Sequence, residues 1–162
     1  MKAGNSRPGN EMEKTPEKTI TISFVPDFGH VDLARAAITG ITRAAFPGPD
    51  SENAADEFAL AVAEAMNNAV EHSGADQVAI NISTYAEKIV FEMRTRGRAF
   101  DPTADVSMPE LEKDGELREG GWGRALVKEL TDSSRYEYSG GLNVLTLEKK
   151  FPAPKKEGTG GN

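Results

Sequence analysis

The sequence predicts an α/β fold in which helices cover one face of a mainly antiparallel sheet. Segments such as residues 19–24 and 78–83 alternate apolar and polar side chains, which is typical of strands that bury only one face. Short links join several of these segments, as in antiparallel hairpins. The strands of a doubly wound parallel sheet would be continuously apolar, because helices bury both of its faces. The alternation therefore argues against that fold.

Length and composition indicate one globular domain. The chain has 162 residues, of which 38% are hydrophobic and 28% charged. Its net charge of -7 argues against non-specific nucleic-acid binding, which needs clustered Lys and Arg. The lack of cysteine excludes disulfides, thiolate nucleophiles and Cys-based zinc sites. No apolar run resembles a signal peptide or a membrane span. We expect a cytoplasmic protein with no membrane and no direct nucleic-acid partner.

The first half of the chain is predicted to hold one strand and two helices. A disordered arm is expected over residues 1–17, a strand over residues 19–24 and a helix over residues 31–46. A Pro-Gly-Pro-Asp break over residues 47–50 separates this helix from an Ala-rich helix over residues 56–72. Gly40 weakens the first helix by about 1 kcal/mol relative to Ala. Ser51 or Asp56 can cap the second helix.

The second half is predicted to hold two hairpins around a loop and a short helix. A hairpin is expected over residues 78–94, and a long polar loop over residues 103–119. A glycine-rich helix start over residues 120–123 is followed by a second hairpin over residues 133–151 and a disordered tail over residues 152–162. A loop of that length inside a compact domain is usually functional, often as a lid. The folded domain is thus expected over residues 18–151.

Glu64 and Asn68 lie four residues apart in the Ala-rich helix, so they share one of its faces. An amide oxygen is a hard ligand that suits a Mg2+ still holding waters and phosphates. A carboxylate can take a proton from a nearby hydroxyl or water. Taken alone, the pair fits a solvated helix surface better. His72, one turn further on, is expected to be a polar residue at the helix C-terminus.

Two glycine motifs follow. The run from Gly120 to Gly123 precedes a helix, where backbone N–H groups and the helix dipole can hold a phosphate. The alternative is an ordinary join between loop and helix, in which Trp122 packs on the core. Gly97 follows a strand and either lets a ligand approach the backbone or is a plain turn glycine.

The order of these motifs resembles the GHKL-superfamily ATP-binding proteins of the anti-sigma factor serine/threonine kinase type, which are RsbW- and SpoIIAB-like. The run Glu64-Ala-Met-Asn-Asn-Ala-Val-Glu-His72 matches the N box of that family. Residues 96–102 match its G1 region, residues 120–126 its G2 box and residues 140–147 its closing hairpin. The resemblance covers about residues 20–151, and it implies a two-layer sandwich with a mixed, mainly antiparallel sheet.

The resemblance also implies roles for single residues. Glu64 would be the catalytic base, and Asn68 would bind ATP and ligate its Mg2+. Gly97 would line the adenine pocket. Further nucleotide contacts fall on the G1 and G2 positions Thr95, Ala99, Gly120, Gly121 and Gly123. The implied partners are an anti-anti-sigma protein of the STAS type, a sigma factor and a second copy of the chain.

Two positions depart from the family pattern. Thr95 replaces the aspartate that accepts a hydrogen bond from the adenine amino group, and a neutral hydrogen bond is roughly half as strong as a charge-assisted one. Ala99 replaces the second glycine of the G1 box, and its methyl group is expected to crowd the backbone. The G1 box is thus degenerate on the adenine side.

Two hypotheses follow for the function. The first is a Mg-ATP-dependent serine/threonine kinase that phosphorylates an anti-anti-sigma partner. The second is a non-catalytic anti-sigma module that binds partners but has weakened or lost ATP binding. A third possibility, the ATPase part of a histidine kinase system, is less favoured, because no helix with a phosphoacceptor histidine precedes the domain.

Overall fold

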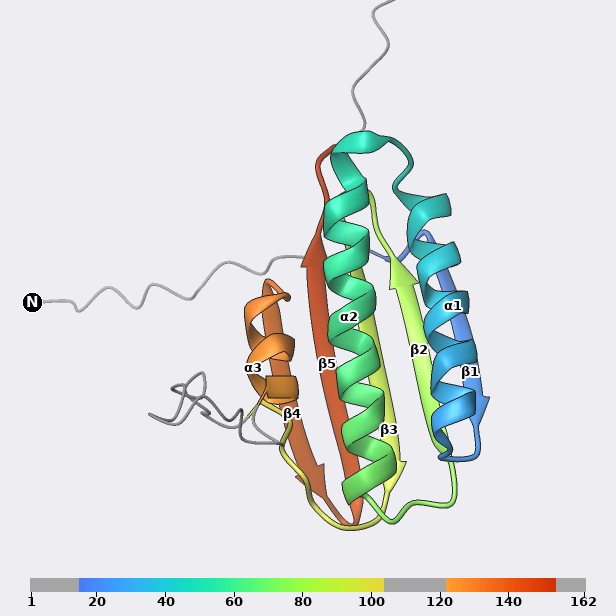
Figure 1. Cartoon of the computed structure of the whole chain (residues 1–162), viewed down its shortest axis with the longest axis vertical. Helices are drawn as coiled ribbons and strands as arrows, with labels where there is room; N and C mark the ends of the chain where they lie inside the picture. The colour runs from blue at the N-terminus through green and yellow to red at the C-terminus, as the bar shows by residue number, and fades with distance from the viewer. Residues whose placement is uncertain (1–14, 104–121, 154–162) are drawn as a thin grey trace, which may run out of the picture.

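The computed structural model describes residues 15–103 and 122–153, which form a two-layer α/β sandwich. Figure 1 shows α1 and α2 side by side over one face of the sheet, with α3 at its β4 edge. In chain order the elements are β1 (Lys18–Phe24), α1 (Phe28–Ala45), α2 (Pro49–His72), β2 (Val78–Thr84), β3 (Lys88–Arg96), α3 (Trp122–Glu129), β4 (Ser133–Ser139) and β5 (Leu142–Lys150).

The sheet has the strand order β1-β2-β3-β5-β4, and all four pairings are antiparallel. The predicted mainly antiparallel sheet with helices on one face is therefore confirmed. Its "mixed" character is not seen, since the described strands contain no parallel pair. The crossover from β3 to β4 lets β5 pair with β3, and this places β5 beside the middle of the sheet.

The core lies between the two layers. Alternate strand residues such as Ile80, Phe91 and Leu147 are fully buried under the helices. α2 contributes Phe58 and Met66, which have no exposed surface. Burial of side chains of this size is worth roughly 1.5–3 kcal/mol each. The apolar side chains that alternate along the strands and those that recur at helical spacing along α2 therefore pack in one core.

α1 begins earlier than the predicted residue 31. Asp27 caps the helix, because its carboxylate accepts hydrogen bonds from the backbone N–H groups of Gly29 at 2.8 Å and His30 at 3.3 Å. The helix therefore includes Phe28, three residues before the predicted start.

α2 begins at Pro49, seven residues before the predicted start at residue 56. Proline is favoured in the first helical position, because the missing N–H has no partner there in any case. The capping residue is Gly48, with φ of 109°, and no side chain caps this end. The prediction that Ser51 or Asp56 caps the helix was therefore wrong.

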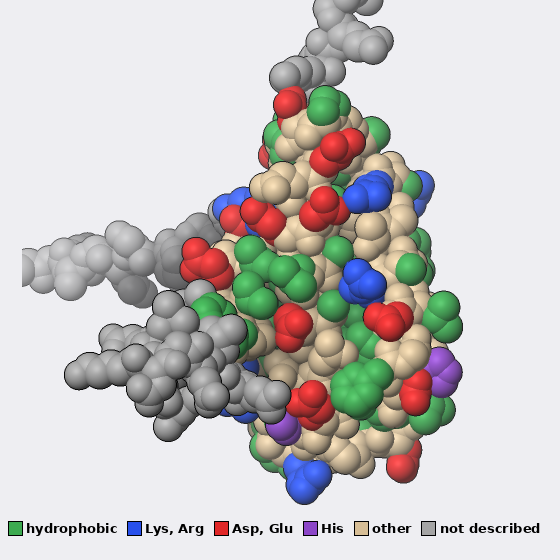
Figure 2. All heavy atoms as spheres, in the orientation of Figure 1, with side chains coloured by type: hydrophobic (Ala, Val, Ile, Leu, Met, Phe, Trp, Pro, Cys, Tyr) green, Lys and Arg blue, Asp and Glu red, His purple; other side chains and the backbone are tan. Residues whose placement is uncertain are grey.

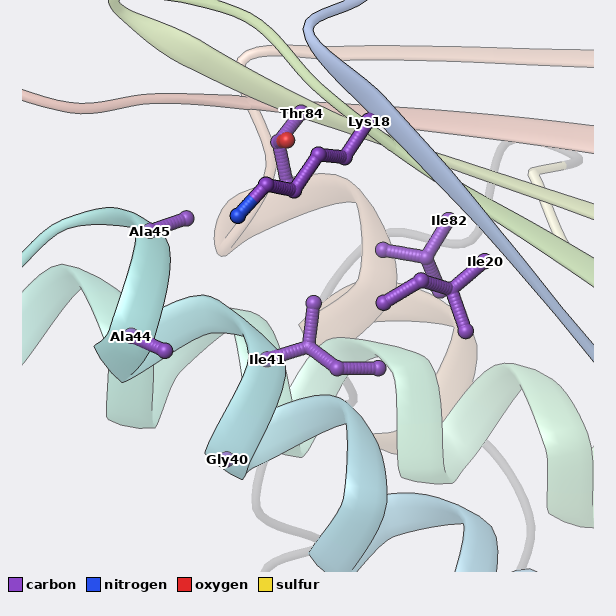
Figure 3. Close-up of a pocket in the computed structure, with 8 residues that line it drawn as sticks. All are labelled: Lys18, Ile20, Gly40, Ile41, Ala44, Ala45, Ile82 and Thr84. Atoms are coloured by element: carbon purple, nitrogen blue, oxygen red, sulfur yellow. The ribbon is translucent and has the colours of Figure 1, made fainter.

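A pocket of about 310 Å³ lies between the C-terminal half of α1 and the β1–β2 edge of the sheet. Figure 3 shows Ile20, Ile41 and Ile82 converging on it, with Lys18 and Thr84 toward one end. Gly40 also lines it, and a Cβ atom at this position would have no atom within 4 Å. The glycine is therefore not required by packing within the chain.

Several predictions fall on residues that the structure does not describe. Residues 1–14, 104–121 and 154–162 include most of the predicted arm, lid and tail. The domain bounds of 18–151 thus remain a prediction, although Phe151 is buried and stacks on Phe46 with ring centroids 4.1 Å apart. Across the two described ranges, no helix has the length and apolarity that a membrane crossing needs.

Candidate functional site

The predicted catalytic base, Glu64, lies on α2 where this helix packs against α3. A Cβ atom at Gly123, the second residue of α3, would lie 2.6 Å from Glu64 Oε2. Real Cβ contacts essentially never fall below 3.0 Å, so only glycine leaves room for the carboxylate as it stands. The fold therefore brings together two predicted site residues that are far apart in the sequence.

The environment of Glu64 makes it a stronger base. Burial raises the pKa of the Glu64 carboxyl above its ordinary value, and the negative charge of Glu71 raises it further. A carboxylate whose pKa lies closer to neutrality accepts a proton more readily from a reacting hydroxyl. The chemistry expected of Glu64 therefore agrees with its surroundings.

Asn68 lies one turn after Glu64 on the same face of α2. Its Nδ2 atom is buried and has no hydrogen-bond partner. Such an atom costs roughly 1–3 kcal/mol if nothing binds it, so it calls for an explanation. Rotation of the amide exchanges its nitrogen and oxygen, and the oxygen is a suitable ligand for Mg2+. The residue thus fits the predicted metal role.

Thr95 lies near the end of β3 and faces the helices. It is only 2% exposed, and its Oγ1 atom is buried without a hydrogen-bond partner. In residues 15–103 and 122–153, the other side-chain atoms of this kind are Asn68 Nδ2 and Trp122 Nε1, which lies at the start of α3. A hydroxyl can both donate and accept, so Thr95 can bind a polar ligand atom of either kind.

Gly97 connects the end of β3 to the end of α2 through the backbone. A Cβ atom at Gly97 would lie 2.0 Å from the carbonyl oxygen of Ser73. That oxygen accepts a hydrogen bond of 2.8 Å from the backbone N–H of Arg98. Gly97 is therefore required for a contact within the chain. The sequence had offered two other reasons for this glycine, a close approach of a ligand or a plain turn, and neither of them includes this contact. Its place in an adenine pocket remains a prediction.

A cleft of about 590 Å³ lies beside the last turn of α2. Its walls come from the end of α2, the segment after β3 and the start of α3, namely Glu71, His72, Arg98, Ala99, Phe100, Asp101 and Arg124. No non-glycine residue in the described part of the chain has a positive φ. Ala99 therefore lacks the special dihedral angles on which the expected crowding depended, and the effect of its methyl group on nucleotide binding stays a prediction.

Asn143, on β5, is a functional candidate that the sequence did not point out. It is 2% exposed, and its Nδ2 donates to the carbonyl oxygens of Arg98 at 2.9 Å and Thr95 at 3.3 Å. Its Oδ1 accepts from the Tyr136 hydroxyl at 2.6 Å and from the Phe100 N–H at 3.3 Å. One buried amide thus holds the backbone of the segment that lines the cleft.

Tyr136, on β4, supports the same segment. Its hydroxyl also accepts a hydrogen bond of 3.1 Å from the Phe100 N–H. Burial raises the pKa of the Tyr136 phenol, so the group stays protonated and donates to Asn143 at neutral pH. Only pairing of β4 with β5 reveals this cluster, since the sequence offers no motif for it.

The histidine kinase-like ATPase domain family matches residues 24–149, which is most of the chain. The chain belongs to this family. The matched range runs from the end of β1 to near the end of β5, so it includes every described element that contributes to the cleft. The predicted resemblance to RsbW-like GHKL proteins is confirmed.

Two proteins similar to this chain are serine-protein kinases by name. The serine-protein kinase RsbW of Listeria monocytogenes serotype 4a is 29% identical over 140 residues, which are 81% of this chain and 87% of the relative. The protein of the same name from Listeria innocua is 28% identical with the same coverage.

A solved structure agrees on the fold. A Mycobacterium tuberculosis protein, described by its RsbU and RsbW domains, matches 85% of this chain with a TM-score of 0.54 and 20% identity. The match covers 34% of that longer chain.

The structure places the predicted site residues of this histidine kinase-like ATPase domain in two groups. One group lies at the contact of α2 with α3, and the other lies where the end of β3 meets the end of α2. The first contains Glu64 and Gly123, with Asn68 one turn along α2 from Glu64, and the second contains Thr95, Gly97 and Ala99. Gly120 and Gly121 lie outside the described residues. The individual roles remain predictions.

Proposed function

We propose that this chain is an anti-sigma factor serine/threonine protein kinase that uses Mg-ATP to phosphorylate an anti-anti-sigma partner. The observation that carries the proposal is the Glu64 carboxylate, which lies against Gly123 with a raised pKa. The partly identical RsbW relatives, which are serine-protein kinases by name, support the reaction class.

In this proposal Glu64 accepts the proton of the acceptor serine or threonine hydroxyl. The hydroxyl oxygen then forms a bond to the γ-phosphorus of ATP as the bond to ADP breaks. Phosphoryl transfer depends mainly on positioning and charge neutralisation, so the chain's task is to hold the reactants in line. The rigid α2 helix is well suited to that task, since it carries both Glu64 and Asn68.

Asn68 would hold the Mg2+ that accompanies ATP. The ion would neutralise charge on the phosphates when bound. The buried, unpartnered Nδ2 of Asn68 and Oγ1 of Thr95 support a polar ligand near these residues. Gly120, Gly121 and Gly123 would offer backbone N–H groups to the phosphates.

The proposal extends to regulation. When the anti-anti-sigma partner is phosphorylated, the chain would bind a sigma factor instead, so transcription would be controlled by partner switching in the cytoplasm. The active form would be a homodimer. These points come from the family resemblance alone.

A second candidate function is a partner-binding anti-sigma module that does not use ATP. Thr95 is the observation that favours it, because a neutral hydroxyl replaces the expected carboxylate on the adenine side. In that case, the helices and sheet would be kept for partner binding alone.

Calorimetric titration with ATP, in the presence and absence of Mg2+, separates the two candidates. Micromolar, Mg2+-dependent binding supports the kinase, whereas no heat at millimolar ATP supports the binding module. If ATP binds, the kinase is tested with a candidate STAS-type partner by intact-mass spectrometry. Glu64→Gln should abolish the added phosphate and leave ATP affinity within about threefold. Equal phosphorylation by Glu64→Gln would remove Glu64 from the mechanism.

A further inference from the structure

Two arginines from separate parts of the chain line the cleft beside α2. Arg98 follows β3, and Arg124 lies in the first turn of α3, one residue after Gly123. Since Gly123 abuts Glu64, this wall of the cleft adjoins the proposed base. The arginines thus place positive charge close to where the reaction is proposed to occur.

Each carboxylate that lines the cleft has a polar neighbour close by in the sequence. Asp101 Oδ1 accepts hydrogen bonds from the N–H of Thr103 at 2.8 Å and from its hydroxyl at 2.7 Å. Glu71 Oε2 lies 3.5 Å from His72 Nε2. Neither Arg98 nor Arg124 has a carboxylate within ion-pair distance among the described residues. Among residues 15–103 and 122–153, neither guanidinium group is therefore held in an ion pair, although the carboxylates of Glu71 and Asp101 line the same cleft.

Arg98 is held by its backbone. Its N–H donates to Ser73 O at 2.8 Å, and its carbonyl oxygen accepts from Asn143 Nδ2 at 2.9 Å. Its guanidinium packs over Gly74, where an added Cβ atom would lie 3.6 Å from Nε. The backbone of Arg98 is thus anchored to the end of α2 and to β5, which fixes the point from which its side chain reaches the cleft.

We propose that Arg98 and Arg124 form a clamp that binds the phosphates of the nucleoside triphosphate. This inference rests on the proposed function and adds two binding residues, within the G1 and G2 segments, to which the family resemblance gave no role. A guanidinium matches phosphate oxygens with paired, charge-assisted hydrogen bonds. Figure 2 shows both acidic and basic side chains spread over the helix-bearing face, so the clamp is defined by the two arginines that line the cleft and not by the charge of that face.

If the two arginines bind phosphates, the affinity of the chain for a ligand should rise with the number of charged phosphate groups on that ligand. ATP should bind more tightly than ADP, and inorganic triphosphate alone should bind measurably. An increase in salt from about 0.05 to about 0.5 M should weaken binding of all three, because salt screens exposed charges.

The test is calorimetric titration of the full chain with Mg-ATP and with inorganic triphosphate. The variants are Arg98→Gln, Arg124→Gln and the double substitution. Arg135→Gln is the matched control, since Arg135 lies on β4, is exposed and pairs with Glu137 at 3.6 Å outside the cleft. Each single variant should lose about tenfold in affinity for both ligands, which is typical of one charged hydrogen-bonded contact, and the control should lose less than about twofold.

The outcomes separate this inference from the proposed function. If the wild-type chain binds ATP and the two arginine variants bind it equally well, the clamp is wrong and the kinase proposal stands. If the wild-type chain binds inorganic triphosphate through the arginines but phosphorylates no partner, the clamp stands and the kinase proposal fails. If the variants lose affinity only for a partner protein, the arginines form a docking surface and the clamp is overturned.

Discussion

Replacement of Gly123 with alanine should move the Glu64 carboxylate without removing it. The new Cβ atom would lie 2.6 Å from Glu64 Oε2, and the closest tolerable approach is 3.0 Å, so the carboxylate must retreat by about 0.4 Å (3.0 Å minus 2.6 Å). Because a flexible side-chain end can move, the fold itself should not suffer. Alanine in a helix should instead stabilise the domain, by up to about 1 kcal/mol.

We expect Gly123→Ala to lower the rate of phosphoryl transfer. A misplacement of about 1 Å can lower a rate roughly 100-fold, so a retreat of this size corresponds to a loss of about sixfold in phosphoryl transfer. The assay measures the initial rate of partner phosphorylation, ATP affinity by calorimetry and the melting temperature of the same sample. Gly40→Ala is the matched control, since it also adds a methyl group to a helix but meets no atom within 4 Å.

Three outcomes are informative for Gly123→Ala. A slower rate with unchanged ATP affinity and an unchanged or higher melting temperature supports the placement of Glu64 as the base. A loss of ATP affinity would instead place bound phosphate against Gly123, as the family resemblance implies. A full rate with unchanged affinity would refute the reasoning, because the carboxylate would have moved with no effect.

Three further predictions concern the surroundings of the site. Gly97→Ala places a Cβ atom 2.0 Å from a backbone oxygen, so we expect a loss of about 2–4 kcal/mol in unfolding free energy, measured by urea denaturation; unchanged stability would contradict the close approach. Tyr136→Phe removes a hydrogen bond of 2.6 Å and should lower stability by about 1–2 kcal/mol, whereas the exposed Tyr138→Phe should change it little. Glu71→Gln removes a negative charge that raises the pKa of Glu64, so the acid limb of the pH–rate profile should move to lower pH; an unmoved limb would mean that another group limits the rate.

The sequence by itself determined the layer architecture and the pairing of Glu64 with Asn68. Both depend on local periods, because alternation defines a one-sided strand and a spacing of four defines one helix face. Helix starts were less predictable, since Asp27 and Pro49 act through caps and backbone constraints that hydrophobic periodicity does not record.

Only the tertiary structure decided how the site is assembled. The contact of Glu64 with Gly123 joins α2 to α3, and the approach of Gly97 to Ser73 joins β3 to α2. Asn143 reaches the same segment from β5. These contacts connect residues that are distant along the chain, so their distances depend on how helices pack on the sheet and not on any local pattern. The unpartnered atoms that favour a bound ligand likewise become visible only when every neighbouring donor and acceptor has been placed.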